Sequence, residues 1–226
     1  MRVSLAVIAV LTGLVLLPSR SGAQNCQPPT INSATSVEAI RGYFQKRNLT
    51  VVTFLGYSAA DYEDKAAMLK RAEGVLSGLD PARTIVNIGA TIDGIGAVYA
   101  MAKEKGFETV GIVSSQARVS NATLAPCAGT VFFVEDESWG GMLTGTNTLS
   151  PTSTTLVSVS DRIVAIGGGD VARDEFNAAR RLGKKTEFFP ADMNHEIARA
   201  RAARNKQPPP TDFRGALAAA LAGSAQ

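Results

Sequence analysis

The stretch RIVAIGGGDVARDE, residues 162–175, decides the fold. An apolar run reaches three consecutive glycines, Gly167, Gly168 and Gly169, and passes into a segment of helical character that contains Glu175. A short apolar run that ends in glycine and precedes a helical pattern is typical of a strand–turn–helix junction. This junction is the repeating unit of a parallel α/β fold.

The same alternation extends through most of the chain. We expect strands over residues 49–56, 83–89, 108–115, 129–136, 161–169 and 185–191. Helices are expected over 37–47, from a cap at Ser58 to about Gly78, over 93–106 and 170–183, and near 196–204 and 211–221, with a polar loop over 137–155. The strands are almost continuously apolar, as in a sheet covered on both faces. The pattern therefore predicts one α/β domain over 49–226 with a mainly parallel sheet, preceded by a leader over 24–48.

The first 23 residues have the pattern of a signal peptide. Arg2 is followed by an apolar run over 3–17 and by small residues at 21–23. This pattern predicts cleavage after Ala23 and a periplasmic or secreted protein. An uncleaved anchor is the alternative, although the apolar run is shorter than the ~20 residues that a membrane span needs.

Charge and cysteine content narrow the classes of partner. Cleavage removes two arginines, so Lys+Arg falls from 23 to 21 against 20 acids and the net charge falls from +3 to +1. We therefore expect neither nucleic-acid binding nor membrane binding after cleavage. Cys26 and Cys127 are either a disulfide, as an oxidising compartment allows, or two free thiols. Neither lies in a cluster with metal-ligand spacing, so no metal site and no cofactor are predicted.

The carboxyl ends of the predicted strands are the candidate binding edge, because ligands of open α/β sheets bind there. These ends read Gly56-Tyr57-Ser58, Gly89-Ala90-Thr91, Ser114-Ser115-Gln116 and Gly167-Gly168-Gly169. Glycines leave backbone amides uncovered, and the first turn of a following helix attracts anions. The alternative is that these glycines only permit tight turns.

Two of the junctions resemble those of the SLOG superfamily, which includes the Lonely Guy phosphoribohydrolases. GGGDVARDE, residues 167–175, lies over the family motif PGGxGTxxE, and GATIDGIG, residues 89–96, lies over GGSVGLMG. The resemblance covers roughly residues 50–191. It implies a Rossmann-like three-layer sandwich, binding of a nucleotide or sugar phosphate, and a possible homodimer.

The resemblance also implies site residues. The ligand-binding positions would be Gly56, Gly89, Ala90, Thr91, Gly94, Gly167, Gly168, Gly169 and Asp170. Glu175 would be the carboxylate that assists cleavage of an N-glycosidic bond, since a carboxylate near the anomeric carbon can stabilise an oxocarbenium-like transition state. The alternative for Glu175 is an ordinary acid in the first helical turn.

The sequence departs from the family where phosphate would be bound. Val171 and Ala172 replace the Gly-Thr of the motif. Thr152 and Ser153 occupy the positions of the family's Arg-Lys pair, so a basic residue such as Arg118 or Arg173 would have to come from elsewhere. These departures argue against an intact phosphoribohydrolase.

Three functions stay open. The first is a degenerate member that binds a nucleotide-derived or sugar-phosphate ligand with little or no hydrolysis. The second is an active hydrolase of nucleoside monophosphates, and the third is a non-enzymatic protein that binds a partner. Trp139 is expected either to anchor its loop or to stack on a base or sugar, and the basic segment 198–206 is expected to be a solvated helical face.

Overall fold

The computed structural model describes residues 26–223. Seven strands form one sheet in the order β1-β5-β4-β3-β2-β6-β7, and all pairs are parallel. The strands are β1 (Thr30–Asn32), β2 (Thr50–Gly56), β3 (Thr84–Ile88), β4 (Glu108–Ser114), β5 (Thr130–Val134), β6 (Arg162–Ile166) and β7 (Lys185–Phe189). The predicted signal peptide, 1–23, lies outside the described residues.

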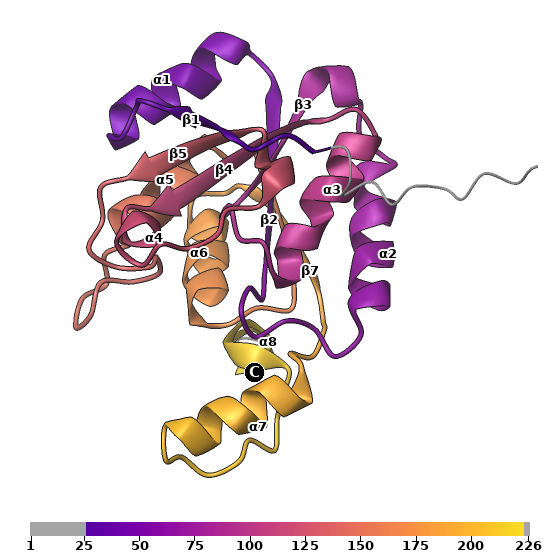
Figure 1. Ribbon diagram of the computed structural model, residues 1–226, viewed down its shortest axis with the longest axis vertical. Helices are drawn as coiled ribbons and strands as arrows, with labels where there is room; N and C mark the ends of the chain where they lie inside the picture. Colours follow the sequence, from indigo (N-terminus) through magenta and orange to yellow (C-terminus); the bar gives the residue numbers. More distant parts are fainter. Residues whose placement is uncertain (1–25, 224–226) are drawn as a thin grey trace, which may run out of the picture.

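Helices cover both faces of the sheet, which makes the fold an α/β, Rossmann-like three-layer sandwich (Figure 1). One face carries α2 (Lys65–Leu76) and α3 (Val98–Glu104), with the short turns η2 (Pro81–Arg83), η3 (Gly94–Ala97), α4 (Gln116–Val119) and η4 (Pro126–Ala128) in the connections. The other face carries α1 (Val37–Arg47), α5 (Pro151–Val159), α6 (Asp170–Arg181) and α8 (Gly215–Gly223). The fold class predicted from the sequence is confirmed.

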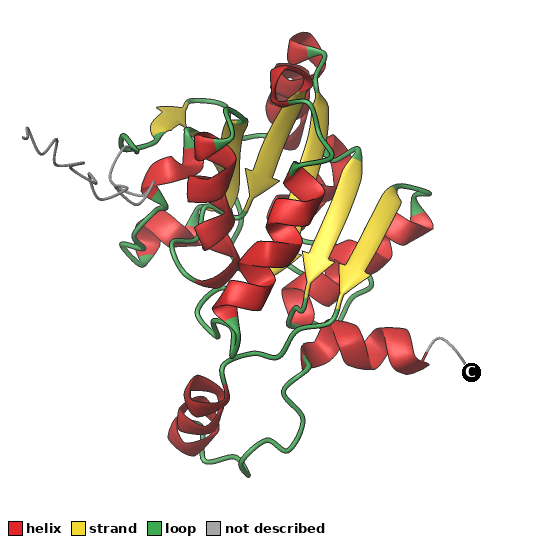
Figure 2. Cartoon of the chain, turned by 90° about the vertical axis from the view of Figure 1, so that its right-hand side faces the viewer, coloured by secondary structure: helices red, strands yellow, loops and turns green. Residues whose placement is uncertain are grey.

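One helix stands apart from these layers. Helix α7 (His195–Arg204) projects beyond the sheet, on a loop that leaves β7 and returns to α8 (Figures 1 and 2). Asn194 caps its first turn by accepting a hydrogen bond from the Ile197 amide at 3.0 Å. None of the helices within residues 26–223 has the length and apolarity needed to cross a bilayer.

The parallel strands explain where a site can form. After β2 the chain moves through β3, β4 and β5 on one side, and after β6 it moves to β7 on the other. Strands β2 and β6 pair directly, from Val52 opposite Arg162 to Gly56 opposite Ile166. The order therefore reverses between β2 and β6, and the loops at their carboxyl ends diverge as at a ligand-binding switch point.

The predicted polar loop over 137–155 is wrong in its last five residues, because α5 begins at Pro151. Ser and Thr have weak helix propensity, so the composition of this segment favoured a loop, although Ser150-Pro151 is a helix-start pattern. Local caps and burial stabilise the helix instead. Ser150 accepts from the Ser153 amide at 3.3 Å, Asp136 accepts from the Thr152 amide at 2.9 Å, and most of the helix is buried.

Two smaller expectations also differ from the structure. Helix α2 is capped by Asp64, whose carboxylate accepts from the Ala67 amide at 2.8 Å, and not by Ser58. The predicted leader contains strand β1, which pairs with β5 at the edge of the sheet. Pairing with β5 therefore orders part of the leader, which its polar composition predicted to be loose.

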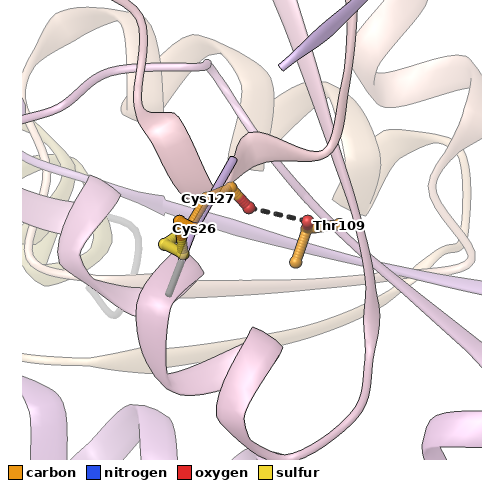
Figure 3. The surroundings of a disulfide bond; sticks show 3 residues. All are labelled: Cys26, Thr109 and Cys127. Atoms are coloured by element: carbon orange, nitrogen blue, oxygen red, sulfur yellow. Dashed lines mark hydrogen bonds between the residues drawn. A yellow bond between two sulfur atoms is a disulfide. The ribbon is translucent and has the colours of Figure 1, made fainter. Parts of the chain in front are cut away.

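The two cysteines form a disulfide, which answers a question that the sequence left open (Figure 3). The Cα atoms of Cys26 and Cys127 are 4.9 Å apart, and 101 residues separate them in sequence. Cys127 is buried just before β5, and its carbonyl accepts a hydrogen bond from the Thr109 hydroxyl at 2.7 Å. The disulfide therefore fastens the chain beside the β1–β5 pair.

Candidate functional site

A cleft of about 1050 Å³ opens at the carboxyl edge of the sheet. Its floor is formed by the ends of β2, β3 and β4, and its walls by the loops that follow them and by residues of α5, α6 and α7. This volume is at the upper end of the range found for small-molecule sites. The cleft begins beside the switch point and extends toward β4.

The cleft brings together half of the residues that the resemblance selected. Gly56, Gly89, Ala90, Thr91 and Glu175 all line it, from β2, from the β3–η3 junction and from α6. The other half does not line the cleft: these are Gly94, Gly167, Gly168, Gly169 and Asp170. A ligand-binding role for this second group stays a prediction.

The first two glycines of the turn in the opening stretch, Gly167 and Gly168, are covered by the protein's own side chains, whereas Gly169 faces open space. A Cβ atom at Gly167 would lie 2.5 Å from the Tyr57 ring, and one at Gly168 would lie 2.6 Å from the Ala172 methyl group. The Gly168 carbonyl accepts a hydrogen bond from the amide of Leu217 in α8 at 3.2 Å. The turn therefore supports the packing of α8 on the sheet edge.

Gly94 has a comparable structural role in the other junction. Its φ is +56°, and an added Cβ atom would overlap the Tyr57 carbonyl. The same carbonyl accepts from the Ile95 amide at 2.8 Å. Close approach of two backbone segments thus requires glycine here.

Glu175 is buried in the cleft wall, with 4% of its surface exposed. The Ser153 hydroxyl donates to Glu175 Oε1 at 2.6 Å and accepts from the Gly141 amide at 2.7 Å. Burial raises the pKa of Glu175 from 4.5 to about 7, and the Asp174 charge adds to this while the Ser153 hydrogen bond opposes it. Glu175 lies in the second turn of its helix, so it is not an ordinary solvated acid of the first turn.

The loop between β5 and α5 is held against this carboxylate. Asp174 accepts from the Met142 amide at 2.9 Å, and Asp136 accepts from the Ser138 amide at 2.8 Å. Burial alone would raise the pKa of Asp136, but hydrogen bonds from Thr152 and Ser138 outweigh it and lower the pKa. Both carboxylates therefore act as anchors that fix the loop beside Glu175.

This anchoring places Trp139 at the cleft, where 55% of its surface is exposed. Three further large apolar side chains that are exposed also line the cleft: Ile92, Val171 and Ile197. Exposed apolar groups that gather in one hollow are characteristic of a binding surface. The exposure of Trp139 argues against a buried loop anchor, and stacking on a ligand stays a prediction.

Helix α7 brings positive charge to the cleft, although its basic segment was predicted to be a solvated helical face. Arg201 and Arg204 both line the cleft. Arg118 and Arg173, the residues considered from the sequence, do not. The Arg118 guanidinium lies 3.9 Å from the centre of the Phe133 ring, and Arg173 pairs with Asp170 and Asp174.

Sequence comparisons give no family. No protein-family model matches the chain, and no curated protein is significantly similar to it. Several solved structures, among them the following two, are similar at low identity. The X-ray structure of TM1055, a structural-genomics target, is 19% identical, with 61% of this chain and 72% of that chain covered and a TM-score of 0.43. The structure of Moco carrier protein from Chlamydomonas reinhardtii is 17% identical, with 79% and 96% covered and a TM-score of 0.45.

The arginines of α7 had one signal in the sequence. Cleft-lining residues of this helix, at 197, 198, 201, 204 and 205, recur with the helical period, so they share one face. The sequence showed that the face exists but not where it points, because that depends on the loop that carries α7.

Among residues 26–223, no group of three or more His, Cys, Asp or Glu side chains could hold a metal ion.

Proposed function

We propose that the protein is an exported, Rossmann-like binding protein whose cleft takes a small nucleotide-derived or sugar-phosphate ligand. The observation that carries this proposal is the composition of one cleft. It combines an exposed tryptophan and other exposed apolar side chains with two arginines and a buried carboxylate. A ring with a phosphate attached has matching chemistry, because a base or sugar stacks on an aromatic side chain and guanidinium binds phosphate.

The polar groups around Glu175 favour binding over turnover. Thr152 and Ser153 stand where the SLOG enzymes carry Arg and Lys. Thr152 lines the cleft, and the Ser153 hydroxyl donates to Glu175. Neither hydroxyl supplies a charge to stabilise a departing dianion, and the Ser153 hydroxyl is buried and already bonded to Glu175 and Gly141. We therefore propose a catalytically degenerate member of this superfamily.

A second function, hydrolysis of an N-glycosidic bond, is favoured by one observation. The pKa of Glu175 is about 7, which suits a group that must accept and release a proton near neutral pH. In this alternative Glu175 orients a water molecule or stabilises the positive charge that develops on the sugar. Glu175→Gln would then stop turnover and leave binding nearly intact.

The proposal of export is supported by the disulfide between Cys26 and Cys127. Disulfides persist in oxidising compartments and are rare in the cytosol. The N-terminal sequence of the secreted protein tests it. The proposal predicts Gln24-Asn25-Cys26 at that terminus, whereas an intact Met1 on protein from the cytoplasm contradicts it.

Binding is tested by isothermal titration calorimetry of the mature protein with AMP, GMP, CMP, UMP and ribose 5-phosphate. We expect saturable binding of at least one compound, and about tenfold weaker binding by Trp139→Ala, because stacking on an aromatic side chain contributes roughly 1–3 kcal/mol. Leu182→Ala is the control, since Leu182 is 66% exposed and lies outside the cleft. Absence of binding by the whole panel contradicts the proposal.

Catalysis is tested on the same samples by chromatography. The binding proposal predicts that the nucleoside monophosphates are recovered intact after long incubation. Free base that appears with the wild-type protein and not with Glu175→Gln would establish the hydrolase instead.

A further inference from the structure

Helix α7 presents a basic face to the cleft. Arg201 and Arg204 are one turn apart and line the cleft together with Ile197 and Asn205. Because residues at spacings of three and four share a helical face, the two guanidinium groups can reach one ligand group.

The side chains of these two arginines have no partner in the part of the chain that the structure describes. Neither makes an ion pair, a side-chain hydrogen bond or a ring contact within residues 26–223. By contrast, Arg199 of the same helix lies 5.2 Å from the centre of the Phe213 ring, and Arg214 pairs with Asp212. The cleft-facing side of α7 thus keeps its charge available for an anion.

The glycine turn at 167–169 is the competing position for an anion, and it is poorly suited. Tyr57 and Leu217 cover Gly167 and Gly168, as described above. At the start of α6, Asp170 and Asp174 both pair with Arg173, so this guanidinium is already engaged and two carboxylates stand where the helix would otherwise attract phosphate. Asp93 brings a further carboxylate to the cleft beside the other glycine junction.

We infer that Arg201 and Arg204 bind the phosphate group of the ligand, in place of the glycine turn. This inference rests on the proposed function and names the group that the site recognises. Thr152, in the wall formed by α5 and α6, lines the same cleft, so a ligand held by the two arginines can extend to that wall.

The experiment compares adenosine 5′-monophosphate with adenosine, which differ only in the phosphate. The single tryptophan of the chain is Trp139, so its fluorescence reports on the cleft alone. The variant is Arg201→Gln/Arg204→Gln, and the control is Arg180→Gln/Arg181→Gln, which removes two exposed charges from α6 outside the cleft. Glutamine keeps nearly the helix propensity of arginine, and circular dichroism checks both folds.

For the wild-type protein we expect tighter binding of adenosine 5′-monophosphate than of adenosine. The cleft variant should bind the monophosphate about 100-fold more weakly, roughly tenfold for each charge-assisted contact that is lost. Its affinity for adenosine should be unchanged, and the control should match the wild-type protein. Phosphate preference that survives in the cleft variant overturns the inference, and so does a wild-type protein that binds both compounds equally well.

Inorganic pyrophosphate separates this inference from the proposed function. If the wild-type protein binds neither adenosine compound nor any other member of the panel, the proposal of a nucleotide or sugar-phosphate ligand fails. Pyrophosphate binding that depends on Arg201 and Arg204 would still support the anion site. Pyrophosphate binding that is absent, or unaffected in the cleft variant, overturns it.

Discussion

Replacing Glu175 with glutamine should change how the stability of the protein depends on pH. The carboxyl group is buried, and its pKa rises from 4.5 to about 7 on folding. Between pH 4.5 and about pH 7 the folded state therefore keeps a proton on Glu175 that the unfolded state has released. The contribution of Glu175 to stability is greatest below its unfolded pKa and is lost as the pH rises through its folded pKa.

The size of this effect follows from the shift. One pKa unit corresponds to 1.36 kcal/mol, so the wild-type protein should lose roughly 3 kcal/mol, with about 2.5 kcal/mol of it between about pH 5 and about pH 8. Glutamine is neutral throughout and retains an oxygen that accepts from Ser153, so Glu175→Gln removes this loss. The variant should be close to wild type near pH 5 and clearly more stable near pH 8.

Guanidinium denaturation followed by circular dichroism at the two pH values measures this difference. Glu104→Gln is the matched control, because Glu104 is exposed on α3 and should leave the pH profile unchanged. A stability difference between Glu175→Gln and wild type that is the same at both pH values would refute the account of this carboxyl group.

Two further predictions concern the fold. Gly168→Ala should destabilise the protein by roughly 1–3 kcal/mol, because φ is +139° and the new Cβ would lie 2.6 Å from Ala172. Gly74→Ala, in open space on α2, should stabilise the protein by about 0.5–1 kcal/mol. Thermal denaturation should show a lower melting temperature for Gly168→Ala and a higher one for Gly74→Ala. The same change in both variants would contradict the packing described for the turn. Replacing Cys26 and Cys127 with serine should cost roughly 2–5 kcal/mol in guanidinium denaturation, since the disulfide closes a long loop. No loss would show that the bond does not stabilise the β1–β5 edge.

The sequence was sufficient for the architecture because the strands carry their own signal. Continuous apolar runs that end in glycine, such as the one before Gly167, predicted a parallel sheet, and the structure has one. It was not sufficient for α5, whose residues are poor helix formers. There, capping by Asp136 and burial of the helix outweigh intrinsic propensity.

The site was predictable only in part, for a similar reason. Glu175 could be placed near the glycine turn, but its burial depends on the loop that Asp136 and Asp174 hold in place from distant segments. The closure of the turn by Tyr57 depends on contacts far along the chain. The orientation of the α7 arginines also depends on contacts far along the chain, and no local sequence pattern encodes it.

The claim that this cleft is the ligand site is tested most directly by amide chemical-shift mapping. The ¹⁵N-labelled mature protein is titrated with adenosine 5′-monophosphate. The account predicts saturable shifts that cluster in residues 89–93, 139–141, 171–175 and 197–205, around the cleft. Shifts confined to other parts of the chain, or no shifts at all, would contradict it.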